Sequence, residues 1–131
     1  MRRTLDTNIC SYILRRRPVG ILERFAGLSG DDIWLSAIVA AELRFGAAKL
    51  GAARFSATIE AWLAGFDVRP WPVEATRHYA TVRTALERQG QPIGNMDLMI
   101  AAHALAEDSV LITNNAREFR RVPRLAVEEW G

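Results

Sequence analysis

Three acidic side chains occupy positions where the surrounding sequence is apolar. Asp6 follows a short expected strand that ends in Leu5, Glu42 lies two turns into an expected helix, and Asp97 stands at the start of an apolar helix. Removing a carboxylate from water costs several kcal/mol unless hydrogen bonds or a cation compensate. Three such groups on separate elements would repel one another if they met, so the pattern predicts a cation between them.

Oxygen ligands of this kind favour a hard divalent ion. Mg²⁺ and Mn²⁺ take carboxylate and water ligands and also bind phosphate oxygens, which suits chemistry on a phosphodiester. Cys10 is the only cysteine, which excludes an internal disulfide and a zinc site built of cysteines. We expect Cys10 to be a small packed residue, because no group that would stabilise a thiolate is apparent.

Two of the acids also have simple structural explanations. Asp6 and Asn8 could merely cap the helix that follows them, because short polar side chains accept hydrogen bonds from the first free N–H groups. Glu42 could form a salt bridge with Arg44 or Lys49, although these neighbours fall on other faces of the helix. The apolar residues that share its face, and would direct it toward the core, are Ile38, Val39, Phe45 and Gly46.

The helix that begins near Asp97 is apolar nearly all round, which is typical of a buried helix. A carboxylate in a first helical turn offsets the helix dipole by about 0.3–1 kcal/mol, but this effect does not require an inward side chain. Gly94, just before it, allows a close turn of the backbone. His103 lies about 240° round the helix from Asp97, so we do not expect it to reach the acids. His78 falls in an amphipathic helix and is expected to be a surface or structural residue.

Residues 113–115, Thr-Asn-Asn, repeat the pattern of polar groups after a strand that residues 6–8 show. They are a candidate fourth wall of the same site. Asn114 or Asn115 could orient a metal-bound water, Glu118 could supply a further carboxylate, or the two asparagines could simply form a turn. The residues alone do not decide between these alternatives.

The elements that must position these side chains follow from apolar spacing and from helix-ending residues. Short strands are expected at residues 2–6, 33–35, 67–71, 110–113 and 125–128. The first helix is capped by Asn8 and ends at the arginine run 15–17. Further helices are expected at 19–28, 36–50, 53–65, 74–88 and 95–107, with a turn or short helix at 114–119. This alternation indicates an α/β fold with a mostly parallel central sheet sandwiched by helices, and the length suits one domain over residues 1–131.

The charge pattern permits binding to a polyanion. Lys and Arg number 17 against 15 Asp and Glu, a net charge of +2, and arginines crowd both ends of the chain. No apolar run approaches the roughly 18 residues of a membrane span, and the first residues lack the apolar core of a signal peptide. We therefore expect a cytoplasmic protein without membrane association.

Four sequence motifs together resemble one family. They are LDTN at residues 5–8, AELRFG at 41–46, IGNMDLMIAAHA at 93–104 and TNNAREFRRVPRL at 113–125. In this order, and over essentially the whole chain, they resemble the PIN-domain toxins called VapC. The resemblance implies a PIN fold, endoribonuclease activity that depends on Mg²⁺ or Mn²⁺, and neutralisation by a VapB antitoxin, through which any contact with DNA would be made. It also implies a homodimer.

The resemblance further implies roles for single residues. The family's metal-binding aspartates fall on Asp6 and Asp97, and its helix glutamate falls on Glu42. Many relatives carry an aspartate where this chain has Asn115, so we assign Asn115 to the catalytic set with the three acids. The motifs LDTNIC and TNNxREF are most similar to those of a bacterial branch that cuts initiator transfer RNA in the anticodon region.

The expected reaction is hydrolysis of RNA by a metal-bound water, with Glu42 holding that water or a second ion. Two other functions remain open. A phosphohydrolase of the dehalogenase type also places an aspartate after its first strand, but it needs a second aspartate two residues on, where this chain has Asn8. A PIN-like module that binds RNA or protein without catalysis would show no metal-dependent cleavage. An antitoxin helix could dock in an apolar groove between the first helices and helix 36–50.

Overall fold

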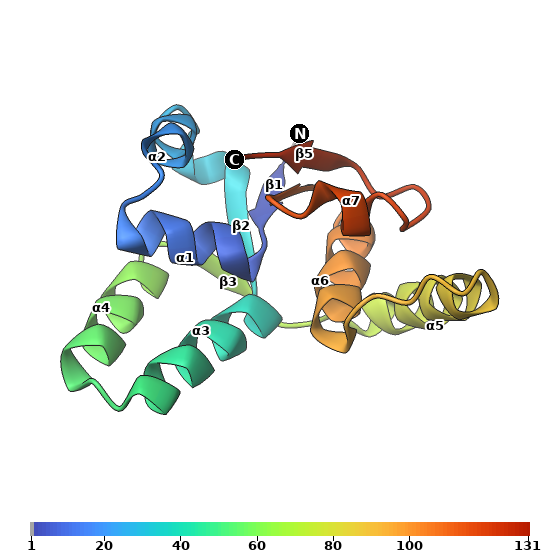
Figure 1. Ribbon diagram of the computed structural model, residues 1–131, viewed down its shortest axis with the longest axis horizontal. Coiled ribbons are helices and arrows are strands. Elements are labelled where there is room, and N and C mark those ends of the chain that lie inside the picture. The colour runs from blue at the N-terminus through green and yellow to red at the C-terminus, as the bar shows by residue number, and fades with distance from the viewer. Residues whose placement is uncertain (1) are drawn as a thin grey trace.

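The computed structural model describes residues 2–131, which form one sheet of five strands (Figure 1). The strand order across the sheet is β3-β2-β1-β4-β5, with β1 at its centre. Each pairing is parallel, so the expected parallel sheet is confirmed. The strands are β1 (Arg3–Leu5), β2 (Ile33–Ser36), β3 (Asp67–Arg69), β4 (Val110–Thr113) and β5 (Val127–Glu129).

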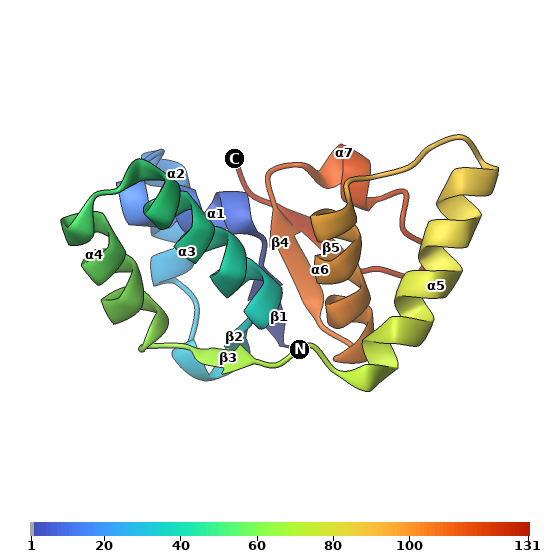
Figure 2. The same ribbon diagram turned by 90° about the horizontal axis from the view of Figure 1, so that it is seen from below.

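The helices of residues 2–131 lie where the apolar spacing predicts them. In Figure 2 the helices of the first half of the chain lie on one side and those of the second half on the other. One expectation is wrong: the first helix begins earlier, so Asp6 rather than Asn8 is its N-cap, and Asn8 is exposed. None of these helices is long and apolar enough to cross a membrane. They are α1 (Thr7–Arg15), α2 (Val19–Ala26), α3 (Ala37–Leu50), α4 (Ala53–Leu63), α5 (Val73–Arg88), α6 (Asn95–Ala106) and α7 (Ala116–Phe119), with a 3₁₀ turn at Gly30–Asp32.

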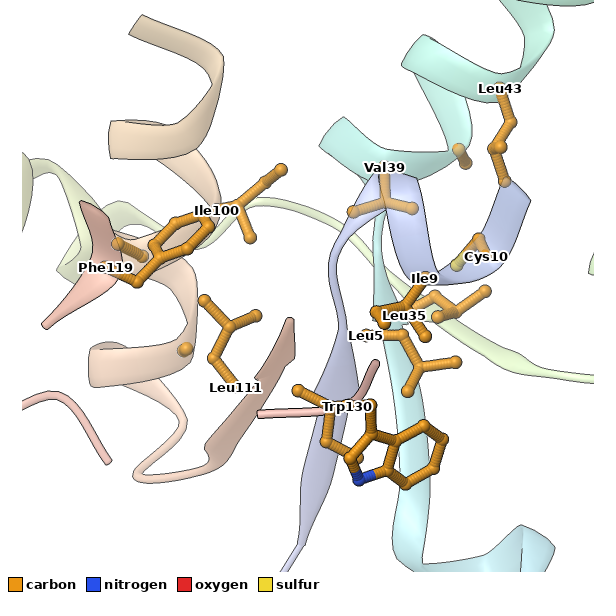
Figure 3. Close-up of a cluster of buried hydrophobic side chains, with 14 of the residues drawn as sticks. Leu5, Ile9, Cys10, Leu35, Val39, Leu43, Ile100, Leu111, Phe119 and Trp130 are labelled. Atoms are coloured by element: carbon orange, nitrogen blue, oxygen red, sulfur yellow. The ribbon is translucent and has the colours of Figure 1, made fainter. Parts of the chain in front are cut away.

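Apolar side chains of the strands and of the helices around them form the core (Figure 3). Leu5, Leu35 and Leu111 of the central strands are fully buried. A parallel sheet carries helices on both faces, which explains why β2 and β4, on either side of β1, are apolar almost without interruption. Cys10 of α1 is also fully buried, and burial raises the pKa of its thiol well above the usual range. Cys10 is therefore a packed residue, as expected.

The parallel arrangement brings the carboxyl ends of the strands to one edge of the sheet. Asp6 follows β1, Ser36 ends β2 and caps α3, and Thr113 ends β4. The register pairs Leu5 of β1 with Ile112 of β4, so the residues that follow them are neighbours. Ligands of open α/β sheets bind at this edge, where the helices begin.

Candidate active site

Asp6 lies at the end of β1 with 4% of its surface exposed. Its Oδ1 accepts a hydrogen bond from the backbone N–H of Ile9 at 2.9 Å, and its Oδ2 accepts one from Oγ1 of Thr113 at 2.5 Å. Burial raises the pKa of Asp6 to about 6, the two hydrogen bonds oppose this rise, and the charge of Glu42 adds to it. Asp6 therefore caps α1 and also faces another acid, so capping accounts for only part of its surroundings.

Glu42 lies on the part of α3 that meets α1. Oγ1 of Thr7 donates a hydrogen bond to Oε1 of Glu42 at 2.6 Å. The alternative salt bridge to Arg44 is wrong, because Arg44 binds both carboxylate oxygens of Glu60 at 2.8 and 2.9 Å. The ion pairs formed within residues 2–131 leave Glu42 out altogether. Glu42 is thus directed toward the start of α1, where Asp6 lies.

Asp97 occupies the first turn of α6 and is partly buried. Its pKa is raised to about 6, and burial is the largest cause. The negative charges of three other acids, Glu118, Asp6 and Glu42, add to the rise. The three acids singled out in the sequence therefore lie close enough to repel one another, together with a fourth.

The fourth wall of the site combines Asn115 with Glu118. Nδ2 of Asn115 donates a hydrogen bond to Oε2 of Glu118 at 2.6 Å. The backbone N–H of Gly94, just before α6, donates to Oε1 of Glu118 at 3.4 Å. Asn114 instead donates to the hydroxyl of Tyr12 at 3.0 Å. Of the three residues considered for this wall, Glu118 carries the negative charge that raises the pKa of Asp97. Asn115 orients the carboxylate of Glu118.

Two threonines hold the acids, and the sequence analysis assigned a role to neither, although both lie in the polar segments that it singled out. Thr7 donates to Glu42, and Thr113 donates to Asp6. Thr113 ends β4, and Thr7 begins α1 two residues after β1 ends, so both belong to the repeated pattern of polar residues at 6–8 and 113–115. That repetition was the available signal, because a hydroxyl next to a strand end can reach a carboxylate on the neighbouring element.

The acids match the donor set of a hard divalent cation. Their carboxylate oxygens are the ligands that Mg²⁺ and Mn²⁺ prefer. As the side chains stand, no three acidic, histidine or cysteine groups among residues 2–131 converge closely enough to enclose an ion. Burial, followed by the negative charges of the neighbouring acids, nevertheless raises the pKa of Asp97, as expected where carboxylates gather in one site. Asp6 and Asp97 therefore stay the predicted metal ligands, on the chemistry of the donors.

His103 lies apart from the acids, as its position on the helix predicts. Its Nδ1 is 2.8 Å from Oγ of Ser36, and its ring packs against Trp34 with centroids 4.5 Å apart. Burial lowers the pKa of His103, so the ring is neutral at pH 7. The contact between His103 and Ser36 joins α6 to the N-cap of α3. Helix α6 carries Asp97, and α3 carries Glu42.

The raised pKa values predict how the stability of the metal-free protein depends on pH. A carboxyl group whose pKa rises from 3.8 to about 6 on folding binds its proton more tightly in the folded state. Ionisation therefore lowers the free energy of unfolding. This loss is absent below about pH 4, grows as the pH rises, and is complete above about pH 6. For the buried Asp6 the full cost is on the order of 3 kcal/mol, and for the partly exposed Asp97 it is smaller.

We expect the melting temperature in EDTA to be higher at about pH 5 than at about pH 7.5. Asp97→Asn should reduce this difference, because the amide does not ionise. Asp31→Asn, at an exposed aspartate, is the matched control and should leave the difference unchanged. Equal pH dependence in the two variants would contradict the raised pKa of Asp97.

Comparison with known proteins matches residues 4–125 to the PIN domain. The tRNA(fMet)-specific endonuclease VapC of Shigella flexneri is 39% identical over 128 residues, which cover 97% of this chain and 96% of the relative. Ribonuclease VapC2 of Rickettsia felis is 38% identical over 128 residues, with 96% of each chain covered. The likeness thus extends over nearly the whole of both proteins.

Solved structures agree in fold. DNA-bound VapBC from Salmonella typhimurium matches with a TM-score of 0.92 and 36% identity, covering 100% of this chain and 99% of that one. VapBC2 from Rickettsia felis, bound to a DNA fragment from its promoter, matches with a TM-score of 0.89 and 35% identity over 100% of both chains. With its acids gathered at the edge of a parallel sheet, the chain belongs to the PIN-domain family and, within it, to the VapC ribonuclease toxins.

Proposed function

We propose that this toxin is an endoribonuclease that depends on Mg²⁺ or Mn²⁺ and cuts structured RNA. Asp6, Glu42 and Asp97 are its proposed catalytic acids, and Asn115, which the resemblance adds to this set, is proposed to act through Glu118. The observation that carries the proposal is the gathering of these acids at one edge of the parallel sheet, where burial and the charges of Glu118, Asp6 and Glu42 raise the pKa of Asp97. A concentration of partly buried acids destabilises a fold at neutral pH, so it points to a functional site.

Asp6 and Asp97 would hold the metal ion. When bound, such an ion supplies positive charge to the scissile phosphate and lowers the pKa of a coordinated water. Thr7 donates to one carboxylate oxygen of Glu42, which leaves the other free to accept a proton from the attacking water. Glu42 thus acts as the general base in this proposal.

Asn115 acts by positioning Glu118. Its amide donates to Oε2 of that glutamate, and the Gly94 N–H donates to Oε1. The two hydrogen bonds fix the carboxylate beside the start of α6, where its charge acts on Asp97. An asparagine with a glutamate thereby takes the place of the single aspartate that many relatives carry.

The anticodon region of a transfer RNA is the first substrate to test. The relatives from Shigella flexneri and Salmonella typhimurium are both named tRNA(fMet)-specific endonucleases, at 39% and 38% identity. Unpaired loops expose base edges that a protein can read, which duplex RNA does not. Action on an RNA of translation is also consistent with the cytoplasmic location expected from the sequence.

The experiment that tests the proposed function is cleavage of transfer RNA by the purified chain in Mg²⁺ or Mn²⁺. We expect discrete fragments, and we expect Asp6→Ala to slow their formation by about 100-fold or more. Asp31→Ala, at an exposed aspartate, should cut normally. Binding of RNA without any cutting in either metal would favour the alternative, a catalytically inactive PIN-like module.

The partner that neutralises the toxin is proposed to be a VapB antitoxin. The matched solved structures from Salmonella typhimurium and Rickettsia felis are VapBC complexes bound to DNA, and in this proposal the antitoxin makes the DNA contact. A groove of about 210 Å³ has Thr7 and Glu42 among its lining residues. An antitoxin helix could lay apolar side chains in it while a basic side chain reaches the acids. The apolar residues that line the groove are Leu14, Leu43, Leu50, Phe55 and Ile59.

Replacing Leu50 by glutamine should weaken antitoxin binding by about 10-fold or more, because a polar amide would be buried in an apolar contact. Leu50 is 70% exposed, so the fold should tolerate the change. Val73→Gln, at an aliphatic residue on α5 that is 84% exposed, is the control that should bind normally. Isothermal titration with the antitoxin measures both. Unchanged affinity of Leu50→Gln would place the antitoxin on another surface.

The homodimer that the resemblance implies stays a prediction. Phe45, which the sequence places on an inward face of α3, is instead 68% exposed. Large exposed apolar side chains are common where another protein covers the surface. We propose Phe45 as a contact between two copies of the chain.

A further inference from the structure

A pocket lies at the C-terminal end of α1, whereas the acids gather near the N-terminal end of this helix. Tyr12, Arg15, Arg17 and Pro18 line this pocket, which has a volume of about 260 Å³ and is called the Tyr12 pocket below. Tyr12 is half-buried, and both arginines are exposed. The pocket therefore offers a mostly apolar lining that includes an aromatic residue, with two exposed arginines at its edge.

The ring of Tyr12 is held in a fixed relation to Asp6. Asp6 caps α1, and Tyr12 lies six residues further along the helix, about 9 Å along its axis. Nδ2 of Asn114 donates to the Tyr12 hydroxyl at 3.0 Å. Asn114 directly follows Thr113, whose hydroxyl donates to Asp6. The ring is thus tied to the acids along α1 and also across the end of β4, which lies beside the start of α1 (Figure 2).

Three consecutive arginines stand at this end of α1. Arg15 ends the helix, Arg16 takes a left-handed conformation with φ of 60°, and Arg17 precedes Pro18. None of them takes part in the ion pairs formed within residues 2–131. The helix dipole favours a positive charge at Arg15, but it does not explain a run of three. This excess of charge is available to an anionic ligand.

We propose that the Tyr12 pocket binds one unpaired base of the RNA substrate, stacked on the Tyr12 ring, while adjoining phosphates contact Arg15 and Arg17. The inference rests on the proposed ribonuclease function and adds a site that selects single-stranded RNA beside the cut. Stacking on an aromatic ring, with arginines along the backbone, is how single strands are commonly held. The pocket lies about 9 Å along α1 from Asp6, where the RNA is proposed to be cut. Stacked nucleotides are spaced about 3.4 Å apart. The base in the pocket is therefore two or three nucleotides from the cut.

An acidic peptide is the main alternative ligand. Its carboxylates would match the arginines, but it would bring no planar group to the aromatic ring. A nucleotide matches both features, since each base has a π-face and each phosphate a negative charge. The combination of ring and arginines therefore favours RNA.

The test compares two probes that share one backbone. A fluorescein-labelled uridine oligomer of about 12 nucleotides, and the same oligomer with abasic sites throughout, are titrated with the full chain in EDTA, so that binding is measured without cleavage. We expect the unaltered chain to bind the uridine oligomer about 10-fold more tightly than the abasic one. Tyr12→Leu should lose most of this preference, whereas Tyr12→Phe, which keeps the ring, should retain it.

The arginines should act on both probes alike. Arg15→Ala and Arg17→Ala should each weaken binding of either oligomer and reduce the salt dependence of the affinity by about one phosphate contact. Arg88→Ala, an exposed arginine at the end of α5, is the matched control and should change neither quantity.

Equal affinity of the unaltered chain for the two oligomers would overturn the proposal, and this result needs no variant to fold. A folded Tyr12→Leu variant that keeps the full preference for bases would overturn it as well. Weakened antitoxin binding with unchanged oligomer binding would assign the pocket to a protein partner. Failure of the proposed ribonuclease function looks different, because cleavage would be absent while the preference for bases persists.

Discussion

Replacing Asp97 by asparagine should abolish the growth arrest that expression of this chain alone is expected to cause in bacteria. The exchange keeps the size of the side chain and removes its charge. A toxin that has lost one carboxylate of its metal site should cut RNA about 100-fold more slowly or worse. Colony counts after induction of the unaltered gene and of the Asp97→Asn gene measure the effect on growth. A cleavage assay with the two purified proteins measures the effect in solution.

The same exchange should leave the fold intact, which separates lost chemistry from lost structure. The pKa of Asp97 is raised to about 6 by burial and by neighbouring acids, so a neutral amide relieves a cost at pH 7. The melting temperature of Asp97→Asn in EDTA should therefore equal or exceed that of the unaltered chain. Asp31→Asn should remain toxic. A folded Asp97→Asn protein that stayed fully toxic would refute the assignment of the metal site.

Chelation by EDTA should abolish RNA cutting, and added Mg²⁺ or Mn²⁺ should restore it. The fragments should carry a 5′-phosphate and a free 3′-hydroxyl. These ends arise when water attacks the phosphorus and the 3′ oxygen leaves, which is the outcome expected of carboxylates that activate a water with a metal. End-labelling and ligation of the fragments identify the ends directly.

The competing chemistry uses the neighbouring 2′-hydroxyl of the RNA and leaves a cyclic phosphate. It requires a general base and a general acid, which are often two histidines. The chain has two histidines, but His103 is fully buried against Ser36, and His78 lies on α5. Cyclic phosphate ends, or cutting that persists in EDTA, would overturn the roles of Asp6, Glu42 and Asp97.

The positions of strands and helices could be predicted because they depend on local spacing. The order of the strands could not, since the central place of β1 rests on its pairing with β4, more than a hundred residues away. The predicted start of α1 was wrong because its cap also depends on a distant contact. Asp6 and Asn8 can both cap a helix, and the residue that caps is the one that Thr113 also binds.

Face assignments failed where a helix is apolar on several sides. Val39 and Phe45 flank Glu42 at opposite edges of the face that the sequence directs inward, yet Val39 is fully buried and Phe45 is 68% exposed. Apolar residues surround much of α3, so their spacing does not single out the face that meets the sheet. Packing against the sheet and against α1 and α4 determines it instead.

The candidate acids could be singled out because charge in apolar surroundings is costly, whatever the fold. The wall at residues 113–118 could not be resolved in the same way. Asn114 and Asn115 are adjacent and chemically identical, but one turns to Tyr12 and the other to Glu118. The turn between β4 and α7 sets those directions, and a local pattern does not reveal them.

The division of the acids between the two halves of the chain has a genetic consequence. Asp6 and Glu42 come from α1 and α3, on one side in Figure 2, while Asp97 and Glu118 come from α6 and α7 on the other. A nonsense or frameshift mutation before codon 118 therefore leaves every truncated product without a complete set of acids. Cells under selection to escape the toxin have almost the entire reading frame as a mutational target, and disabling alleles should be spread along it.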